Sequence, residues 1–281
     1  MDENKSRKAA KKSRSTVKII LIVLCVILLC VFLYSGYKIL STIIGYKQAE
    51  KAHTEAVNTY VQVAQSPAPA PDVPAAPEEP AEPQGDGIDP EISPLNVDFT
   101  GLRSQNPDIV AWIYGPNSVI NYPIAYTEDN FYYLDHMYNG EMNANGTIFI
   151  DCRNASDFSD QNTCIYGHNM NDGSMFASLR NYRDESYYPE HKVLYMSTPN
   201  FNYRIDVLAG FVTEPTSFAY APNFDTPEQF MGHIQLIRDL STFKADEIEV
   251  KDTDHIVTLS TCTYERDDGR YVIVGKLTRI H

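Results

Sequence analysis

An uncharged apolar run near the amino end restricts which part of this 281-residue chain can form a globular core. Residues 19–37 hold no charged side chain and consist mostly of Ile, Leu, Val, Cys and Phe. Nineteen residues at the rise of an α-helix just cross a bilayer core of about 30 Å. The 18 residues up to the run carry seven Lys and Arg against two acidic residues, a flank that stays cytoplasmic. We therefore expect a cytoplasmic tail at 1–18, a single-pass signal anchor at 19–45 and an extracellular remainder.

The alternative to an anchor is a cleaved signal peptide, and the same region argues against it. The apolar run of such a peptide would be shorter, and no A-x-A cleavage site follows closely. A lipoprotein anchor through Cys25 or Cys30 is also disfavoured, because Leu24 and Leu29 occupy the position where a small residue is needed. Residues 19–37 thus predict attachment to the cell membrane.

The next segment, 46–94, has the composition of a spacer. Residues 46–65 contain neither Pro nor Gly and predict a juxtamembrane helix. Residues 66–94 hold nine of the 17 prolines, interleaved with Ala and Glu, which favours an extended stalk over a packed core. A ligand for a proline-recognising domain is the weaker interpretation. The globular domain is therefore expected at 95–281.

The extracellular part is strongly acidic. The whole chain has 23 basic and 37 acidic side chains, and removing the cytoplasmic tail leaves 16 and 35. Such a surface repels polyanions, so neither nucleic acid nor anionic lipid is expected as its partner. Solubility within a polyanionic surface layer is the interpretation we favour.

From Leu95 onward the chain changes to short apolar segments separated by turns, which predicts a mainly β domain. Eight strands within some 187 residues, with few helices between them, indicate a mostly antiparallel closed sheet. The strands are expected near 109–114, 119–124, 147–151, 163–167, 192–197, 203–213, 255–261 and 271–277. Flanking helices are expected near 98–105, 127–135, 174–181 and 226–243.

Three of the five cysteines, Cys152, Cys164 and Cys262, lie outside the apolar run. An odd and low number in an exported protein does not make a disulfide framework, and it indicates a thiol that is kept free for chemistry. Cys152 and Cys164 end and begin neighbouring predicted strands, so a bridge between them stays open. Packing as small apolar residues is favoured for both.

Cys262 ends a predicted strand, in the motif TLSTC. Alternation along this strand places Ser260 and Cys262 on the less apolar face, opposite Leu259. The hydrophilic residues 263–269 follow directly. Cys262 should therefore lie at the end of its strand, at one opening of the barrel, and not in the middle of the barrel.

A histidine and an arginine occupy comparable strand positions. His168 follows an apolar strand in the motif YGHN, whereas the other six histidines lie in predicted helices, at strand starts or at the last position. Arg270 enters the strand after Cys262, and its rival Arg266 stands in the middle of the intervening loop. An imidazole can accept a thiol proton and return it to a departing amine, and a guanidinium can bind a developing oxyanion. Together with a thiol, these groups indicate an acyl-transfer site.

The motifs TLSTC and YGHN, with an arginine at the start of the last strand, resemble those of the sortases, class B in particular. The resemblance covers residues 95–281 and implies an eight-stranded sortase barrel, to which class B members add a helix matching 226–243. It implies a cysteine transpeptidase with Cys262 as nucleophile, His168 as proton carrier and Arg270 as oxyanion ligand. The implied partners are surface proteins, cleaved after Thr in a C-terminal NPxTx or PxTG-like sorting motif, and the amine of a cell-wall precursor.

Substrate contacts and cofactors are less well marked. Ser260 and Thr261 adjoin the nucleophile, and a backbone N–H near Thr261 or Thr263 could serve the oxyanion. Asn121 falls where class B enzymes have a pocket asparagine, and a turn or strand-edge role fits it equally well. Some class B enzymes carry an aspartate after the cysteine, where this chain has Thr263, so the group that orients His168 stays open. The sequence holds no metal-ligand cluster or phosphate-binding glycine loop, and we expect no cofactor.

Three other functions fit part of the sequence. A pilin polymerase of the same family would often carry an aromatic residue after Asp89-Pro90, where this chain has Glu91, although some class B members build pili. The L,D-transpeptidases have a glycine before the cysteine, where this chain has Thr261. An adhesin on a stalk explains the anchor and the linker but not the three motifs. Anchoring of proteins to the cell wall of a Gram-positive bacterium is therefore the function we expect.

Overall fold

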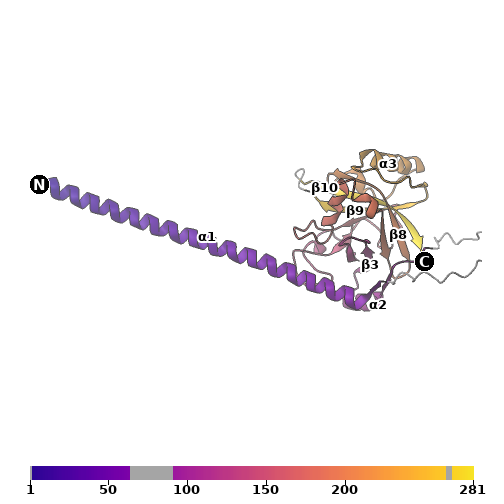
Figure 1. Cartoon of the computed structure of the whole chain (residues 1–281), viewed down its shortest axis with the longest axis horizontal. Helices are drawn as coiled ribbons and strands as arrows, with labels where there is room; N and C mark the ends of the chain where they lie inside the picture. The colour runs from indigo at the N-terminus through magenta and orange to yellow at the C-terminus, as the bar shows by residue number, and fades with distance from the viewer. Residues whose placement is uncertain (1, 64–90, 264–267) are drawn as a thin grey trace, which may run out of the picture. The chain divides into compact units, whose positions relative to one another are not determined.

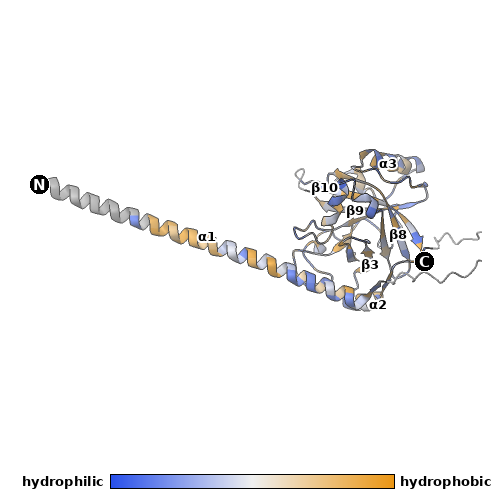
Figure 2. Cartoon of the chain, viewed as in Figure 1, coloured by the Kyte–Doolittle hydropathy of each residue, from blue (hydrophilic) through white to orange (hydrophobic). Residues whose placement is uncertain are grey.

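The computed structural model describes residues 2–63, 91–263 and 268–281. The chain divides into two compact units, Met1–Gln48 and Ala49–His281, which are considered separately. The first unit belongs to helix α1 (Asp2–Tyr60), whose apolar run is orange in Figure 2. Within the described residues, Leu21–Tyr60 is the one helical stretch that is long and apolar enough to cross a membrane. This composition fits the expected anchor, whose topology stays a prediction.

The second unit is built around a closed barrel of eight strands, in the spatial order β10-β8-β7-β3-β4-β5-β6-β9. Figure 1 labels β3, β8, β9 and β10 of this barrel. Two neighbouring pairs, β4 with β5 and β6 with β9, are parallel, and the other pairs are antiparallel. The predicted eight-stranded barrel is confirmed. Its strands are β3 (Ile109–Tyr114), β4 (Asn121–Ala125), β5 (Ile148–Ile150), β6 (Asn162–Tyr166), β7 (Val193–Ser197), β8 (Asn202–Thr213), β9 (His255–Cys262) and β10 (Arg270–Ile280).

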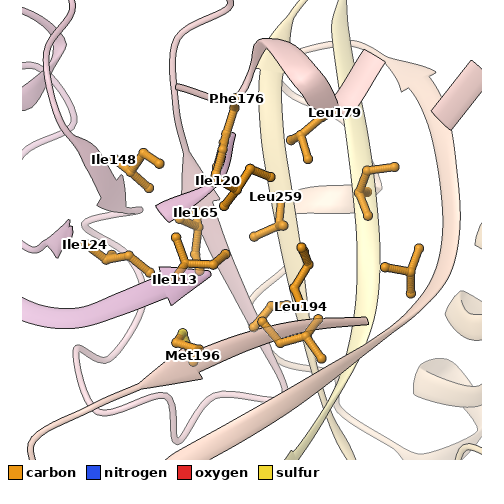
Figure 3. Close-up of a cluster of buried hydrophobic side chains, with 14 of the residues drawn as sticks. Ile113, Ile120, Ile124, Ile148, Ile165, Phe176, Leu179, Leu194, Met196 and Leu259 are labelled. Carbon is orange, nitrogen blue, oxygen red and sulfur yellow. The ribbon is translucent and has the colours of Figure 1, made fainter. Parts of the chain in front are cut away.

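Alternate residues of the strands fill the barrel interior with apolar side chains (Figure 3). Ile113, Ile124 and Leu259 are fully buried there, on three different strands. Such burial is the main favourable contribution to folding, at roughly 25 cal/mol per Å² of apolar surface. Because Leu259 points inward, Ser260 and Cys262 belong to the outer face of β9, as the alternation predicts.

Helix α3 (Pro227–Leu240) covers the outer face of the barrel beside β8 and β10, and it confirms the helix expected at 226–243. Thr226 caps its amino end by accepting the N–H of Gln229. Pro227 fills the first helical position, where no N–H donor is needed. The buried side chains of α3 are Phe230, His233, Ile234 and Ile237. The helix expected at 98–105 is also confirmed, as α2 (Phe99–Gln105).

The helices expected at 127–135 and 174–181 are wrong in type and extent. The first region forms only the short 3-10 helix η1 (Tyr132–Leu134), within a run of aromatic residues of modest helix propensity. The second forms the 3-10 helix η2 (Ala177–Arg183), which starts later than expected because Met175 has a left-handed φ of 57°. Two further 3-10 helices are η3 (Tyr188–Glu190) and η4 (Phe218–Tyr220).

The end of α1 belongs to the second unit. Ala56 is fully buried in an apolar cluster with residues on the outer face of the barrel. The predicted juxtamembrane helix ends at Tyr60, and β1 (Val61–Val63) then pairs antiparallel with β2 (Leu95–Val97). The compact unit therefore begins before the expected domain start, and most of the stalk expected at 66–94 lies outside the described residues.

Candidate active site

Two parallel strands carry Cys262 and His168 to the same end of the barrel. Cys262 is the last residue of β9, and Tyr166, the last residue of β6, pairs with Ser260. The Gly167 N–H extends this ladder by donating to the Ser260 carbonyl at 3.1 Å. His168 and Cys262 each lie two residues beyond the last pair. The parallel register therefore brings the imidazole-bearing and thiol-bearing residues level on adjacent strands.

Asn169 links the histidine segment directly to the cysteine. Its side-chain Nδ2 donates to the Cys262 carbonyl at 2.9 Å, and the residue is only 8% exposed. Because Asn169 follows His168 in the chain, this bond fixes the two backbones relative to each other. The YGHN motif contains the amide, but only the structure reveals the backbone group that it binds.

Arg270 stands opposite Cys262 on the neighbouring strand. The two residues are direct partners in the antiparallel ladder of β9 and β10, so their side chains project from the same face. Nη1 of the half-buried Arg270 donates to the carbonyls of Asp268 at 3.0 Å and of Gly269 at 3.1 Å. Arg270 is therefore the cross-strand neighbour of Cys262, and its guanidinium is bonded to backbone carbonyls of its own hairpin. The rival Arg266 lies outside the described residues.

Buried hydroxyl groups line the outer face of β9 next to Cys262. Ser260 is 1% exposed, and its Oγ shares a hydrogen bond of 2.9 Å with the Tyr220 hydroxyl. Burial raises the pKa of Tyr220 to about 12, against smaller opposing effects of the Ser260 bond and the Arg270 charge, so this hydroxyl is neutral at physiological pH. Thr261 is also buried, but alternation turns its side chain to the opposite face. Ser260 is thus the candidate that shares a face with Cys262.

Asn121 is the first residue of β4 and lies at the same end of the barrel. β4 runs parallel to β5, and β5 runs antiparallel to β6, so the start of β4 and the end of β6 coincide. The Asn121 Oδ1 accepts the indole N–H of Trp112 at 2.7 Å. In the described part of the chain, no hydrogen bond joins Asn121 to Cys262, His168 or Arg270. Its contact with substrate therefore stays a prediction.

Thr263, the residue after the cysteine, is engaged through both its backbone and its side chain. Its N–H donates to the Gly269 carbonyl at 2.9 Å, and its hydroxyl accepts from the Arg183 guanidinium at 2.6 Å. Arg183 also lies over the Tyr271 ring, 4.7 Å from the centroid. The Thr263 N–H, one of the expected oxyanion donors, is thus bonded within the protein's own hairpin.

The imidazole of His168 has a backbone partner that the sequence did not indicate. Its Nε2 lies 2.7 Å from the carbonyl oxygen of Leu134, the last residue of η1. A carbonyl only accepts hydrogen bonds, so Nε2 carries the proton and Nδ1 is the acceptor of the neutral ring. A backbone oxygen leaves no mark in the sequence. The nearest signal is the Asn145-Gly146 pair, which is typical of a tight turn close to this segment.

The other two thiols of this unit have different surroundings. Cys164 lies within β6 and is fully buried, which raises its thiol pKa to about 12. Cys152 is half-buried, and both cysteines are free, so the bridge left open between them is absent from the described structure. Cys262 is free and half-buried. Of the three, Cys262 alone ends a strand beside a histidine and an arginine.

This set of groups is suited to nucleophilic acyl transfer. The thiol can form a covalent bond to an acyl carbon, the imidazole can move its proton, and the guanidinium can stabilise negative charge on oxygen. Across the described residues, no three His, Cys, Asp or Glu side chains gather as metal ligands.

Comparison with known proteins decides the family. A model of the sortase domain matches residues 116–278, more than half of the chain. The chain belongs to the sortase family. Sortase B from Listeria monocytogenes is 39% identical over 178 residues, which cover 63% of this chain and 72% of the relative. Sortase B from Staphylococcus aureus is 28% identical over 272 residues, which cover 96% and 98%.

Solved structures give the same result for the barrel. A sortase B from Bacillus anthracis in complex with AAEK1 has a TM-score of 0.67 and 31% identity, and the match covers 84% of this chain and 99% of that one. A Staphylococcus aureus sortase B–substrate complex has a TM-score of 0.61 and 29% identity, with coverage of 64% and 84%. This sortase is therefore a class B cysteine transpeptidase, and the resemblance based on TLSTC and YGHN is confirmed.

Proposed function

We propose that this sortase cleaves surface proteins after the threonine of a C-terminal sorting motif, NPxTx or PxTG-like, and joins them to an amine of the cell wall. One observation carries the proposal: β6 and β9 are parallel and in register, and Arg270 is the ladder partner of Cys262. A thiol, an imidazole and a guanidinium therefore share one end of the barrel. These groups match the nucleophile, the proton carrier and the oxyanion ligand that the transfer needs.

In the first half-reaction, the Cys262 sulfur bonds to the threonine carbonyl carbon while the His168 imidazole accepts the thiol proton. The carbonyl oxygen gains the negative charge, which the Arg270 guanidinium stabilises. For this, Nη1 exchanges its bonds to the Asp268 and Gly269 carbonyls for a bond to the substrate oxygen. The C–N bond after threonine then breaks, and the imidazolium gives its proton to the departing amine. A thioester on Cys262 remains.

In the second half-reaction, an amine of the cell wall replaces the departed peptide. Its nitrogen bonds to the thioester carbon while His168 accepts a proton from it. The C–S bond breaks, and the proton returns to the Cys262 sulfur. The acyl chain is then held by a new amide bond, and the enzyme is restored.

The same proposal includes a single-pass membrane anchor. Residues 19–37 would cross the bilayer, with the basic tail inside and the barrel outside the cell. The supporting observation is the long apolar helical stretch Leu21–Tyr60 together with the seven basic residues that precede residue 19. The acidic extracellular part would meet its substrates at the membrane surface, where wall precursors are displayed.

A peptide assay tests the function. Full-length protein in detergent is incubated with peptides that carry NPxTx, PxTG-like or scrambled motifs, with and without triglycine as the amine, and the products are identified by mass spectrometry. We expect cleavage directly after threonine in one motif class, and an amide-linked product when triglycine is present. Cleavage at another residue, or no cleavage of any motif by folded protein, would reject the proposal.

A further inference from the structure

A proton-carrying imidazole needs a partner that fixes its ring and its tautomer. A carboxylate often serves, but the position where some class B sortases have an aspartate holds Thr263. Thr263 is 5% exposed, and its hydroxyl accepts from Arg183 at 2.6 Å. Among the described residues, the hydrogen bond made by the His168 ring is the one from Nε2 to the Leu134 carbonyl, at 2.7 Å.

We propose that the Leu134 carbonyl orients His168, and that Gly146 is the positioning residue that lets this carbonyl reach it. The inference rests on the proposed role of His168 as proton carrier. With the proton fixed on Nε2, Nδ1 is free to accept the Cys262 proton and to return it to the departing amine. Nε2–H donates to the carbonyl in both the neutral and the protonated ring, so the ring does not have to turn during the cycle.

The segment that carries the Leu134 carbonyl is held at several points. The Asp129 carboxylate accepts the N–H groups of residues 131–132 at 2.7 and 2.8 Å. Tyr133 is 1% exposed, and its carbonyl accepts the Thr147 N–H at 2.9 Å. The Leu134 side chain, in contrast, is 40% exposed. The segment therefore offers its main-chain oxygen, and not an apolar side chain, to the histidine.

Gly146 packs directly against this segment. Its φ is +62°, and a Cβ added there would collide with the Tyr133 carbonyl oxygen and lie 2.8 Å from the Leu134 oxygen. Both obstacles are backbone atoms, which cannot move aside as the end of a flexible side chain can. Any side chain at 146 would therefore push the Leu134 carbonyl away from its present position.

Gly140 provides a matched control in the same loop. Its φ is +84°, so a side chain there meets the same left-handed backbone, but an added Cβ would find nothing within 4 Å. Gly140→Ala and Gly146→Ala thus share the conformational penalty. Only the second displaces the carbonyl that contacts His168.

The experiment compares the full-length wild type with these two variants in detergent micelles. Steady-state cleavage of a sorting peptide gives kcat and KM, and ¹⁵N NMR of labelled histidine gives the tautomer of His168, assigned with His168→Gln. We expect the Nε2–H tautomer in the wild type and in Gly140→Ala. Gly146→Ala should show a mixture of tautomers and a kcat about 10²-fold lower, with KM within about twofold of wild type.

Several results would overturn the inference. An Nδ1–H tautomer in the wild type would do so even if Gly146→Ala failed to fold. A folded Gly146→Ala variant with an unchanged kcat and tautomer would also overturn it. So would a loss of kcat in Gly140→Ala as large as the loss in Gly146→Ala. The proposed function fails separately: wild type with the Nε2–H tautomer that cleaves no sorting peptide would reject the function and support the orientation of His168.

Discussion

Arg270 is the residue whose proposed role depends most on the shape of its side chain. If it binds the substrate oxygen or the developing oxyanion, Arg270→Ala should lower kcat/KM by roughly 10²–10³-fold. Arg270→Lys keeps the charge but loses the planar fork, so it should also be severely impaired. Arg266→Ala removes the rival arginine and should stay near wild type. Steady-state cleavage of a sorting peptide, with folding checked by circular dichroism, measures all three; comparable losses at both positions would contradict the assignment.

The low pKa of the buried Asp151 carboxylate makes the free energy of unfolding depend on pH. It is 1% exposed, and burial alone would raise its pKa, but hydrogen bonds from Arg153, Tyr166 and Asn130 outweigh burial and hold the pKa at about 2. Since the ordinary value is 3.8, the stabilisation is complete above pH 4 and is lost as the pH falls toward 2. Asp151→Asn should therefore lower the free energy of unfolding by roughly 2 kcal/mol at pH 7, and by less at pH 3. Urea unfolding at both pH values measures this, and a difference that does not change with pH would contradict it.

The side chains of the candidate site stand out in the sequence, whereas its backbone groups are visible only in the structure. Cys262 and His168 stand out because each follows or ends an apolar strand, and Arg270 because it begins one; their catalytic roles stay predictions. The Leu134 carbonyl does not stand out, because every residue has a carbonyl and only folding decides which one meets an imidazole. Ser260 shares a face with Cys262, as alternation predicts, whereas the substrate roles of Thr261 and Asn121 stay predictions.

At the scale of elements, the strands were predictable because apolar alternation and turn residues are local signals. The parallel pairing of β6 with β9 was not, because it joins segments some 90 residues apart. The helix expected at 127–135 is reduced to η1, because its aromatic residues have only modest helix propensity. Local patterns thus predict which segments form strands better than they predict which strands pair with each other.

Helix α3 offers a test at this scale. Thr226→Ala removes the hydroxyl that accepts the Gln229 N–H, and it should lower the free energy of unfolding by about 1 kcal/mol. Gln235→Ala, on the exposed side of the same helix, should change it by less than about 0.5 kcal/mol. Denaturant unfolding of both variants measures the difference. Equal effects would mean that the cap does not stabilise α3.

For the whole molecule, the prediction concerns the residue at which the folded barrel domain begins. Residues 95–281 retain all eight barrel strands and should fold, but they lack the buried Ala56 and the β1–β2 ladder. We therefore expect residues 49–281 to unfold at a Tm about 5 °C higher than residues 95–281, with sorting-peptide cleavage by both. Thermal unfolding followed by circular dichroism measures this. Equal Tm values would mean that the end of α1 adds no stability, and insoluble 95–281 would show that the predicted boundary is wrong.

Cys262 is proposed to carry the acyl chain between the two half-reactions. The direct measurement is to mix the full-length protein with a sorting peptide in the absence of an amine, quench in acid, digest, and locate the adduct by mass spectrometry. We predict a thioester of the peptide fragment ending in threonine on Cys262, absent from Cys262→Ala and retained in Cys152→Ala and Cys164→Ala. An adduct on Cys152 or Cys164, or cleavage by Cys262→Ala, would contradict the account.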